Sequence, residues 1–153
     1  MKILDYLNKE SIIPKLSSES KPQVLRELAE LVAAQHTNIN KDKLIDILAQ
    51  REKLCSTAVD LGVAIPHGKF GGLSNIIAAF GKSDSGIDFE SLDGQPTRLF
   101  ILLVAPDNAA GSHLKLLAKI SNVFKSSEFR QKVLQAGTRD EIYDLIASED
   151  DKY

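Results

Sequence analysis

The spacing of apolar residues changes twice along this chain, and this change restricts the fold more than any other feature of the sequence. Apolar residues recur at helical spacing over residues 20–54 and again from residue 112 onward. Between residues 55 and 105 they form short runs separated by Gly, Asp and Ser clusters, which is typical of strands and turns. Helices before and after a group of strands predict an α/β fold, a three-layer sandwich with helices on both faces of one sheet.

Capping residues and apolar runs mark the expected elements. Ser20 and Pro22 open a helix that should run to about His36, and a second helix is expected over residues 40–54. Helical spacing after residue 112 predicts further helices, the last opened by Thr138 with Glu141 at capping-box spacing, and residues 148–153 are expected to fray. Strands are expected at Gly62–Pro66, Ile76–Phe80 and Leu99–Ala105.

Length and composition describe an ordinary globular protein. The 153 residues fit a single domain, residues 1–153, with 43% hydrophobic residues to form its core. No stretch approaches the roughly 20 apolar residues of a membrane span, and the N-terminus lacks the apolar run of a secretory signal, so we expect a cytoplasmic protein. A net charge of −2 with mixed signs does not favour binding to nucleic acid or to an anionic membrane.

The segment Gly62–Gly68, with the sequence GVAIPHG, is the most informative about function. Pro66 lacks an amide donor and should end a strand, which leaves His67 at the strand end. Ligands of open α/β sheets gather at such ends, and Gly68 would leave room for a visiting group. A neutral imidazole there can attack phosphorus; the alternative is a turn histidine that only satisfies nearby backbone groups.

Four further residues can join His67 in a phosphate site. His113 stands near a predicted helix start, on the apolar stripe, where free backbone N–H groups favour negative charge. Arg51 ends the second helix and can bind phosphate oxygens, and the hydroxyls of Ser56 and Thr57 can donate to them. Each has a structural alternative: the histidine can fill the edge of the core, the arginine can stabilise the helix dipole, and the hydroxyls can bond local backbone.

Other kinds of site have less support. Gly81-Lys82-Ser83 is similar to the end of a P-loop but lacks the earlier glycine and the following helix. Cys55, the lone cysteine, has no thiol-hydrolase signature around it. The histidines at positions 36, 67 and 113 have neither HExxH nor Cys-rich spacing, so no metal and no cofactor is expected.

An ordered set of motifs spans nearly the whole chain. They are Arg51-Glu52 with Ser56-Thr57, GVAIPHG at 62–68, LDGQP at 92–96, LLVAP at 102–106, and His113-Leu114 with Leu117-Ala118. By this set the chain resembles the enzyme IIA family of the fructose, mannitol and nitrogen-regulatory class (type 2) of the bacterial phosphoenolpyruvate phosphotransferase system. It departs from many members at Cys55, where they carry glycine.

The resemblance implies a mixed β-sheet covered by helices on both faces and a phosphohistidine carrier. It implies that His67 is the phosphorylated residue, with His113 and Arg51 beside it, and that the phosphoryl donor is HPr or its nitrogen-branch paralogue. Two roles stay open. A chain without a fused IIB domain favours a nitrogen-type regulator that binds target proteins, and the alternative is a sugar-specific component that passes phosphate to a separate IIB for sugar uptake.

Overall fold

A five-stranded mixed sheet forms the centre of the computed structural model, which describes residues 1–153. The central strands β4 and β5 are antiparallel, whereas β1 pairs parallel with β4. Both β2 and β3 pair parallel with β5, one after the other along the same edge. The strands are β1 (Ile12–Ile13), β2 (Val63–Ala64), β3 (His67–Lys69), β4 (Ile77–Ile87) and β5 (Thr97–Ala105).

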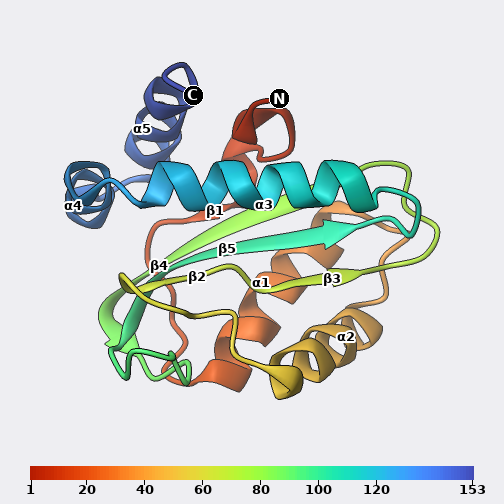
Figure 1. Ribbon diagram of the computed structural model, residues 1–153. Coiled ribbons are helices and arrows are strands. Elements are labelled where there is room, and N and C mark those ends of the chain that lie inside the picture. Colours follow the sequence, from red (N-terminus) through yellow and green to blue (C-terminus); the bar gives the residue numbers. More distant parts are fainter.

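Helices cover both faces of this sheet (Figure 1), which confirms the three-layer sandwich. The first two α-helices lie on one face, and α3 lies on the other together with the C-terminal helices and the N-terminal turns. None of the helices has the length and apolar character that a bilayer span requires. The helical elements are η1 (Ile3–Asp5), η2 (Lys9–Ser11), α1 (Lys21–Gln35), α2 (Lys41–Leu54), α3 (Ala110–Phe124), α4 (Ser127–Gln135) and α5 (Arg139–Asp150).

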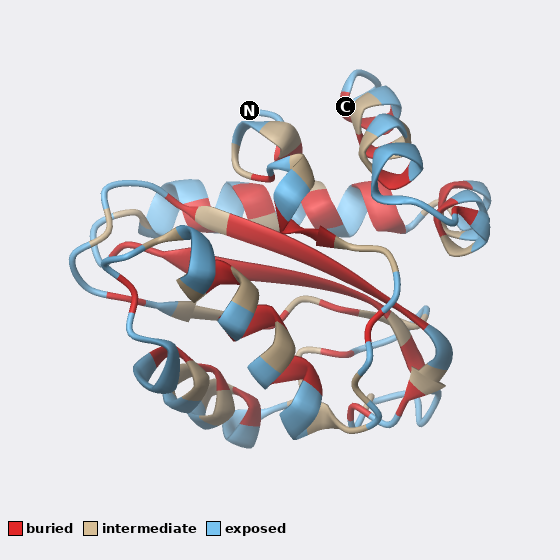
Figure 2. Cartoon of the chain, turned by 180° about the vertical axis from the view of Figure 1, so that it is seen from behind, coloured by how far each residue is buried: buried red, intermediate tan, exposed pale blue.

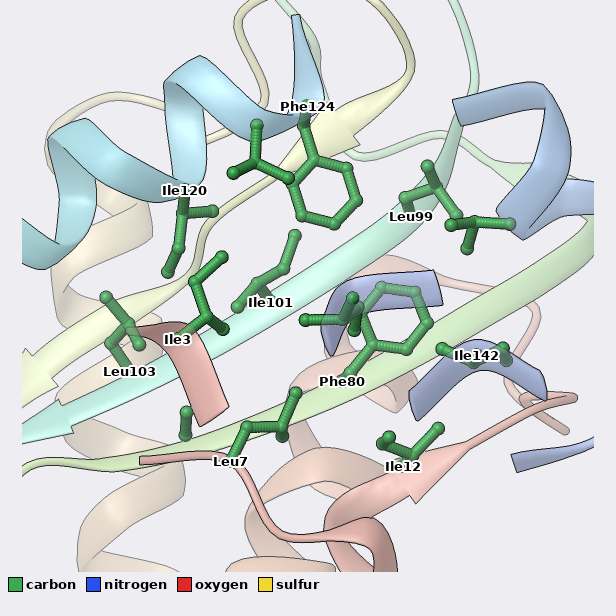
Figure 3. Close-up of a cluster of buried hydrophobic side chains, with 14 of the residues drawn as sticks. Ile3, Leu7, Ile12, Phe80, Leu99, Ile101, Leu103, Ile120, Phe124 and Ile142 are labelled. Carbon is green, nitrogen blue, oxygen red and sulfur yellow. The ribbon is translucent and has the colours of Figure 1, made fainter. Parts of the chain in front are cut away.

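Strand β5 is buried on both faces because its side chains alternate between two cores. Ile101 and Leu103 pack toward α3, where they meet Ile120 (Figure 3). Phe100 and Leu102 point the other way, into the core formed with α1 and α2. Both central strands are buried for much of their length (Figure 2), so the register of this sheet is strongly specified.

Three predicted helix starts are confirmed by cap geometry. The side chains of Ser20, Asn40 and Thr138 each accept a hydrogen bond from the backbone N–H three residues later, at the starts of α1, α2 and α5. These signals are local, since cap and partner are close in sequence. Such pairs therefore identify helix starts before anything is known of the sheet.

The prediction of a frayed C-terminus is wrong for the residues that end α5. Asp150 is buried, and its carboxylate accepts hydrogen bonds from the backbone N–H groups of Ile3, at 2.9 Å, and Leu4, at 3.0 Å. Lys119 Nζ lies 3.4 Å from the same carboxylate. The two ends of the chain are thus held together, because a buried carboxylate needs such partners.

Strand β4 also extends beyond the expected Phe80, through the segment that is similar to a P-loop end. Lys82 lies within the strand and is buried. Its Nζ donates to the carbonyl oxygens of Leu134, at 3.1 Å, and Ala136, at 2.5 Å. These carbonyls are at the C-terminal end of α4, where the helix dipole favours a positive charge.

Candidate functional site

The site lies at the edge of the sheet where β3 passes between α2 and α3 (Figure 1). His67 is the first residue of β3 and aligns with Leu103 of β5, which packs on the α3 side. Because aligned residues of neighbouring strands point to the same face, His67 also faces α3. The expectation that His67 follows a strand end is thereby corrected: β2 stops at Ala64, and after Ile65-Pro66 the chain resumes pairing with β5 at His67 itself.

The second histidine meets the first from α3. His113 lies in the first turns of this helix, is only 8% exposed, and continues the buried stripe of Leu116 and Ile120. The ring centroids of His67 and His113 lie 5.3 Å apart at an interplanar angle of 79°. Sheet register and helix phase therefore bring together two histidines that are distant in sequence.

A hydrogen bond holds the ring of His67 in one orientation. Its Nδ1 atom lies 2.8 Å from the carbonyl oxygen of Ile65. Because a carbonyl oxygen can only accept, Nδ1 must carry the proton, which assigns the lone pair of the neutral ring to Nε2. The arrangement provides a nucleophilic nitrogen whose orientation is set by the backbone.

The environment of His113 favours its neutral ring. Burial lowers the pKa of His113, and repulsion from Lys69 and from the imidazolium form of His67 lowers it further. Its Nε2 atom is buried and has no hydrogen-bond partner. Buried polar atoms are nearly always paired in folded proteins, so an unpaired nitrogen on a residue that lines a cleft is an unusual feature of this site.

We expect acidification to destabilise the protein through His113. Its pKa in the folded protein is below the ordinary 6.5, so the unfolded chain takes up the proton first as the pH falls. The stability contributed by the neutral ring is fully present above the ordinary pKa and is lost as the pH falls through the lowered one. Between about pH 8 and about pH 5, the Tm of the wild type should fall further than that of His113→Gln. Equal falls would contradict the assignment.

A cleft of about 740 Å³ opens between α2, β3 and α3. Its volume is in the range of small-ligand sites. Arg51 lies on its wall, where its Nη1 donates to the carbonyl oxygen of Cys55 at 2.8 Å. No group of three or more His, Cys, Asp or Glu side chains is arranged to hold a metal ion. The cleft is lined by Ile47, Gln50, Arg51, Leu54, His67, Gly68, Lys69, Ala110, His113, Leu114 and Leu117.

Ser56 and Thr57 do not line this cleft, although they follow α2 directly. Ser56 Oγ donates to the carbonyl oxygen of Phe89 at 2.7 Å. Thr57 donates to Glu52 through its backbone N–H, at 3.1 Å, and through Oγ1, at 2.5 Å. Both hydroxyls hold the loop after α2 in place, and their contact with a phosphate stays a prediction.

Several residues of the cleft, among them Lys69, Leu54 and Leu114, were not anticipated as site residues from the sequence. Lys69 follows His67 by two positions in β3, so strand alternation places it on the same face. Because the strand was predicted to end at Pro66, this alternation was not expected. Leu54 is 83% exposed and Leu114 69% exposed, at the ends of α2 and α3 that border the cleft. Both leucines follow the apolar spacing of their helices, and this spacing does not show that they face solvent. Their exposure depends on how the helices pack.

Gly68 has a packing role that was not expected from the sequence. A Cβ atom added there would lie 2.7 Å from Ile47 Cγ2, well inside van der Waals contact. The glycine therefore allows α2 to pack closely against β3, which brings Arg51 toward the edge strand. Gly68 also lines the cleft, and the room that it would leave for a visiting group stays a prediction.

We expect Gly68→Ala to destabilise the protein by about 1–3 kcal/mol, the usual cost of overpacking a close contact. Ile47→Ala removes the clashing methyl group, so the double variant should be more stable than the sum of the two single effects. Gly111→Ala is the control, because an added Cβ meets nothing within 4 Å in α3. Denaturant unfolding of all four variants measures the coupling, and simple additivity would rule out the clash.

The chain is similar to nitrogen regulatory and phosphotransferase proteins along almost its whole length. It is 44% identical over 147 residues to a nitrogen regulatory protein of Bradyrhizobium diazoefficiens, covering 96% of this chain and 95% of the relative. It is 33% identical over 150 residues to the fructose-specific EIIABC component of the Bacillus subtilis PTS, covering 98% of this chain and 24% of that longer protein.

The fold is shared as well. The crystal structure of the nitrogen regulatory protein IIA-Ntr from Neisseria meningitidis superimposes with a TM-score of 0.87 at 28% identity, covering 93% of this chain and 97% of that one. Residues 5–149 match the family model described as phosphoenolpyruvate-dependent sugar phosphotransferase system, EIIA 2. A match of this extent shows that the chain belongs to the EIIA 2 family of the phosphoenolpyruvate-dependent sugar phosphotransferase system.

Proposed function

We propose that the chain carries a phosphoryl group on Nε2 of His67, accepted from the phosphohistidine of HPr or of its nitrogen-branch paralogue in the cytoplasm. Membership of a phosphotransferase-system family supports a transferase-type role in general. The observation that carries the proposal is the 2.8 Å hydrogen bond between Nδ1 and the carbonyl oxygen of Ile65. It leaves the Nε2 lone pair for attack on phosphorus, in a cleft shared with His113 and Arg51.

In the proposed step, Nε2 of His67 attacks phosphorus in line with the P–N bond of the donor. As the new N–P bond forms, the old one breaks and its electron pair returns to the donor imidazole. The proton on Nδ1 stays in its hydrogen bond to Ile65. Such a transfer asks little covalent chemistry of the protein beyond positioning and compensation of charge on the equatorial oxygens.

Arg51 and His113 supply that compensation in this proposal. The guanidinium of Arg51 has five N–H donors, one of which bonds the carbonyl of Cys55, so others can bind phosphoryl oxygens. A phosphoryl group on His67 would also give the unpaired Nε2 of His113 an acceptor. Burial favours the neutral ring of His113, and a neutral ring donates this hydrogen bond without adding a net charge.

The rim of the cleft suits a protein donor. Leu54 and Leu114 are exposed apolar side chains at opposite walls, and we propose that they contact the donor around its phosphohistidine. Lys69 adds a positive charge on the same cleft, which favours approach of the negatively charged phosphoryl group. In this proposal, apolar contact and charge attraction both favour docking of the donor at the cleft.

Incubation of the protein with HPr that carries a labelled phosphoryl group tests the proposal. We expect the label on a single histidine, in an acid-labile and base-stable bond, with mass spectrometry placing it on His67. An unlabelled protein under conditions that label a known family member, or label at another residue, would overturn the proposal.

We further propose that the carrier has a nitrogen-type regulatory role. The relative that supports it is 44% identical over nearly the full length of both chains. The alternative, a sugar-specific component, is supported by the 33% identity to a fructose-specific protein. Adding the IIB partners of the same cell to the phosphorylated protein separates the two: rapid transfer to a IIB favours sugar uptake, and retention of the label favours regulation.

A further inference from the structure

We propose that Glu52, a buried residue outside the cleft, positions His67 in its reactive tautomer through a chain of hydrogen bonds. The inference rests on the proposed transfer at His67. It assigns a positioning role to Glu52 and to Thr57, and neither residue touches the reacting nitrogen. The chain of contacts runs from α1, through α2 and the loop after it, to the residue that holds the imidazole.

The series of hydrogen bonds begins at a buried ion pair. The side chains of Glu52 and Lys21 are 4% and 11% exposed, and Lys21 Nζ lies 3.0 Å from Glu52 Oε1. A carboxylate removed from water needs strong partners, and Glu52 also accepts both hydrogen bonds from Thr57, at 3.1 Å and 2.5 Å. Two donors on one residue fix Thr57 in position and orientation together.

From Thr57 the series of hydrogen bonds continues through backbone groups to the site. The carbonyl oxygen of Thr57 accepts the backbone N–H of Ile65 at 3.4 Å, and the carbonyl oxygen of Ile65 bonds Nδ1 of His67 at 2.8 Å. Ile65 is therefore fixed through its backbone N–H and orients His67 through its carbonyl oxygen. The 3.4 Å contact is the longest link, so a small shift of Thr57 would break it first.

The same loop also anchors the arginine. Cys55, two residues before Thr57, provides the carbonyl oxygen that binds Arg51 Nη1. When Glu52 fixes this loop, it therefore fixes a contact of Arg51 and, through Ile65, the ring of His67. A group that sets the orientation of an imidazole in this way commonly changes activity by about 10- to 100-fold when it is removed, as it does around metal-bound histidines.

Stability alone does not account for a buried ion pair at this place. Replacing such pairs by apolar residues is often neutral or stabilising. A gain in stability is therefore a weak explanation for the pair between Glu52 and Lys21. Its connection to the Nδ1 atom of His67 gives it a second effect, on the tautomer, and this effect can be measured separately from unfolding.

Thr57→Val and Glu52→Gln test the inference. Thr57→Val removes one hydroxyl at nearly constant volume, so it reports on the chain of contacts even where Glu52→Gln fails to fold. We expect each folded variant to accept phosphate about 10- to 100-fold more slowly at saturating donor, with KM for the donor unchanged. In the unphosphorylated protein, the ¹⁵N spectrum of His67 should change from one Nδ1–H tautomer to a mixture.

Asp150→Asn is the matched control, because it neutralises another buried carboxylate that holds backbone N–H groups and a lysine outside the cleft. It should lower stability and leave both the rate and the tautomer of His67 unchanged. Wild-type rate and tautomer in folded Thr57→Val would overturn the inference, as would an equal loss of rate in Asp150→Asn. If the wild type accepts no phosphate, the proposed function fails, while the tautomer comparison still decides whether Glu52 positions His67.

Discussion

His67→Ala should accept no phosphoryl group while keeping the fold. The residue is half-buried at the start of an edge strand, and its backbone pairing with β5 does not depend on the imidazole. Removing the nucleophile eliminates the phosphorylated form altogether, whereas removal of an assisting group only slows its formation. The effect should therefore be an absent product at any reaction time, measured as labelled protein after exposure to phosphorylated HPr.

His36→Ala provides the matched control. His36 follows α1 as its C-terminal cap and does not line the cleft, so its loss should leave labelling at the wild-type level. Circular dichroism and thermal unfolding of both variants verify that they are folded. Labelling of His67→Ala to the wild-type extent, in an acid-labile and base-stable bond, would show that the acceptor is a different residue.

The parts of the fold that were predicted correctly depend on short-range signals. The caps at Ser20 and Thr138 each act within one helical turn, and the apolar spacing that follows them identifies the buried face. Strand β1 was missed because two residues, Ile12 and Ile13, carry no periodicity. Its existence depends on pairing with β4, which is distant in sequence. The buried Asp150 was missed for the same reason, since its partners are at the opposite end of the chain.

The candidate site shows the same division. His67, His113 and Arg51 were each named from local features, and the structure places all three on one cleft. Their relative geometry depends on which way His67 faces in β3, and this is set by its register with Leu103 in β5. A sequence pattern does not contain that register.

The packing role of Gly68 was missed because its neighbour Ile47 belongs to a different element. The hydroxyl of Thr57 was a candidate to donate either to phosphate or to local backbone. In the structure it donates to Glu52, whose charge the sequence shows but whose burial it does not. Direction of a side chain and burial of a charge are both products of tertiary packing. For this reason the residues of the site were predicted more reliably than the groups that their side chains contact.

His113→Ala should slow phosphoryl acceptance by about 10² to 10³-fold, the usual cost of removing one hydrogen-bond donor from transition-state oxygens. The label should still be found on His67, because His113 is buried and its Nε2 is shielded from solvent, whereas the ring of His67 is only half-buried. A docking protein therefore reaches His67 more directly. Rapid-quench measurement of labelled protein gives the rate, and mass spectrometry gives the position of the label.

Ser112→Ala is the control for this experiment, since it changes the neighbouring exposed residue in the same turn of α3 and lies outside the cleft lining. It should transfer at the wild-type rate. His113→Gln retains a hydrogen-bond donor, so it should recover part of the rate if donation to the phosphoryl oxygens is the role of His113. A Gln variant as slow as the Ala variant would favour shaping of the cleft over donation, and label on His113 in the wild type would reverse the roles of the two histidines.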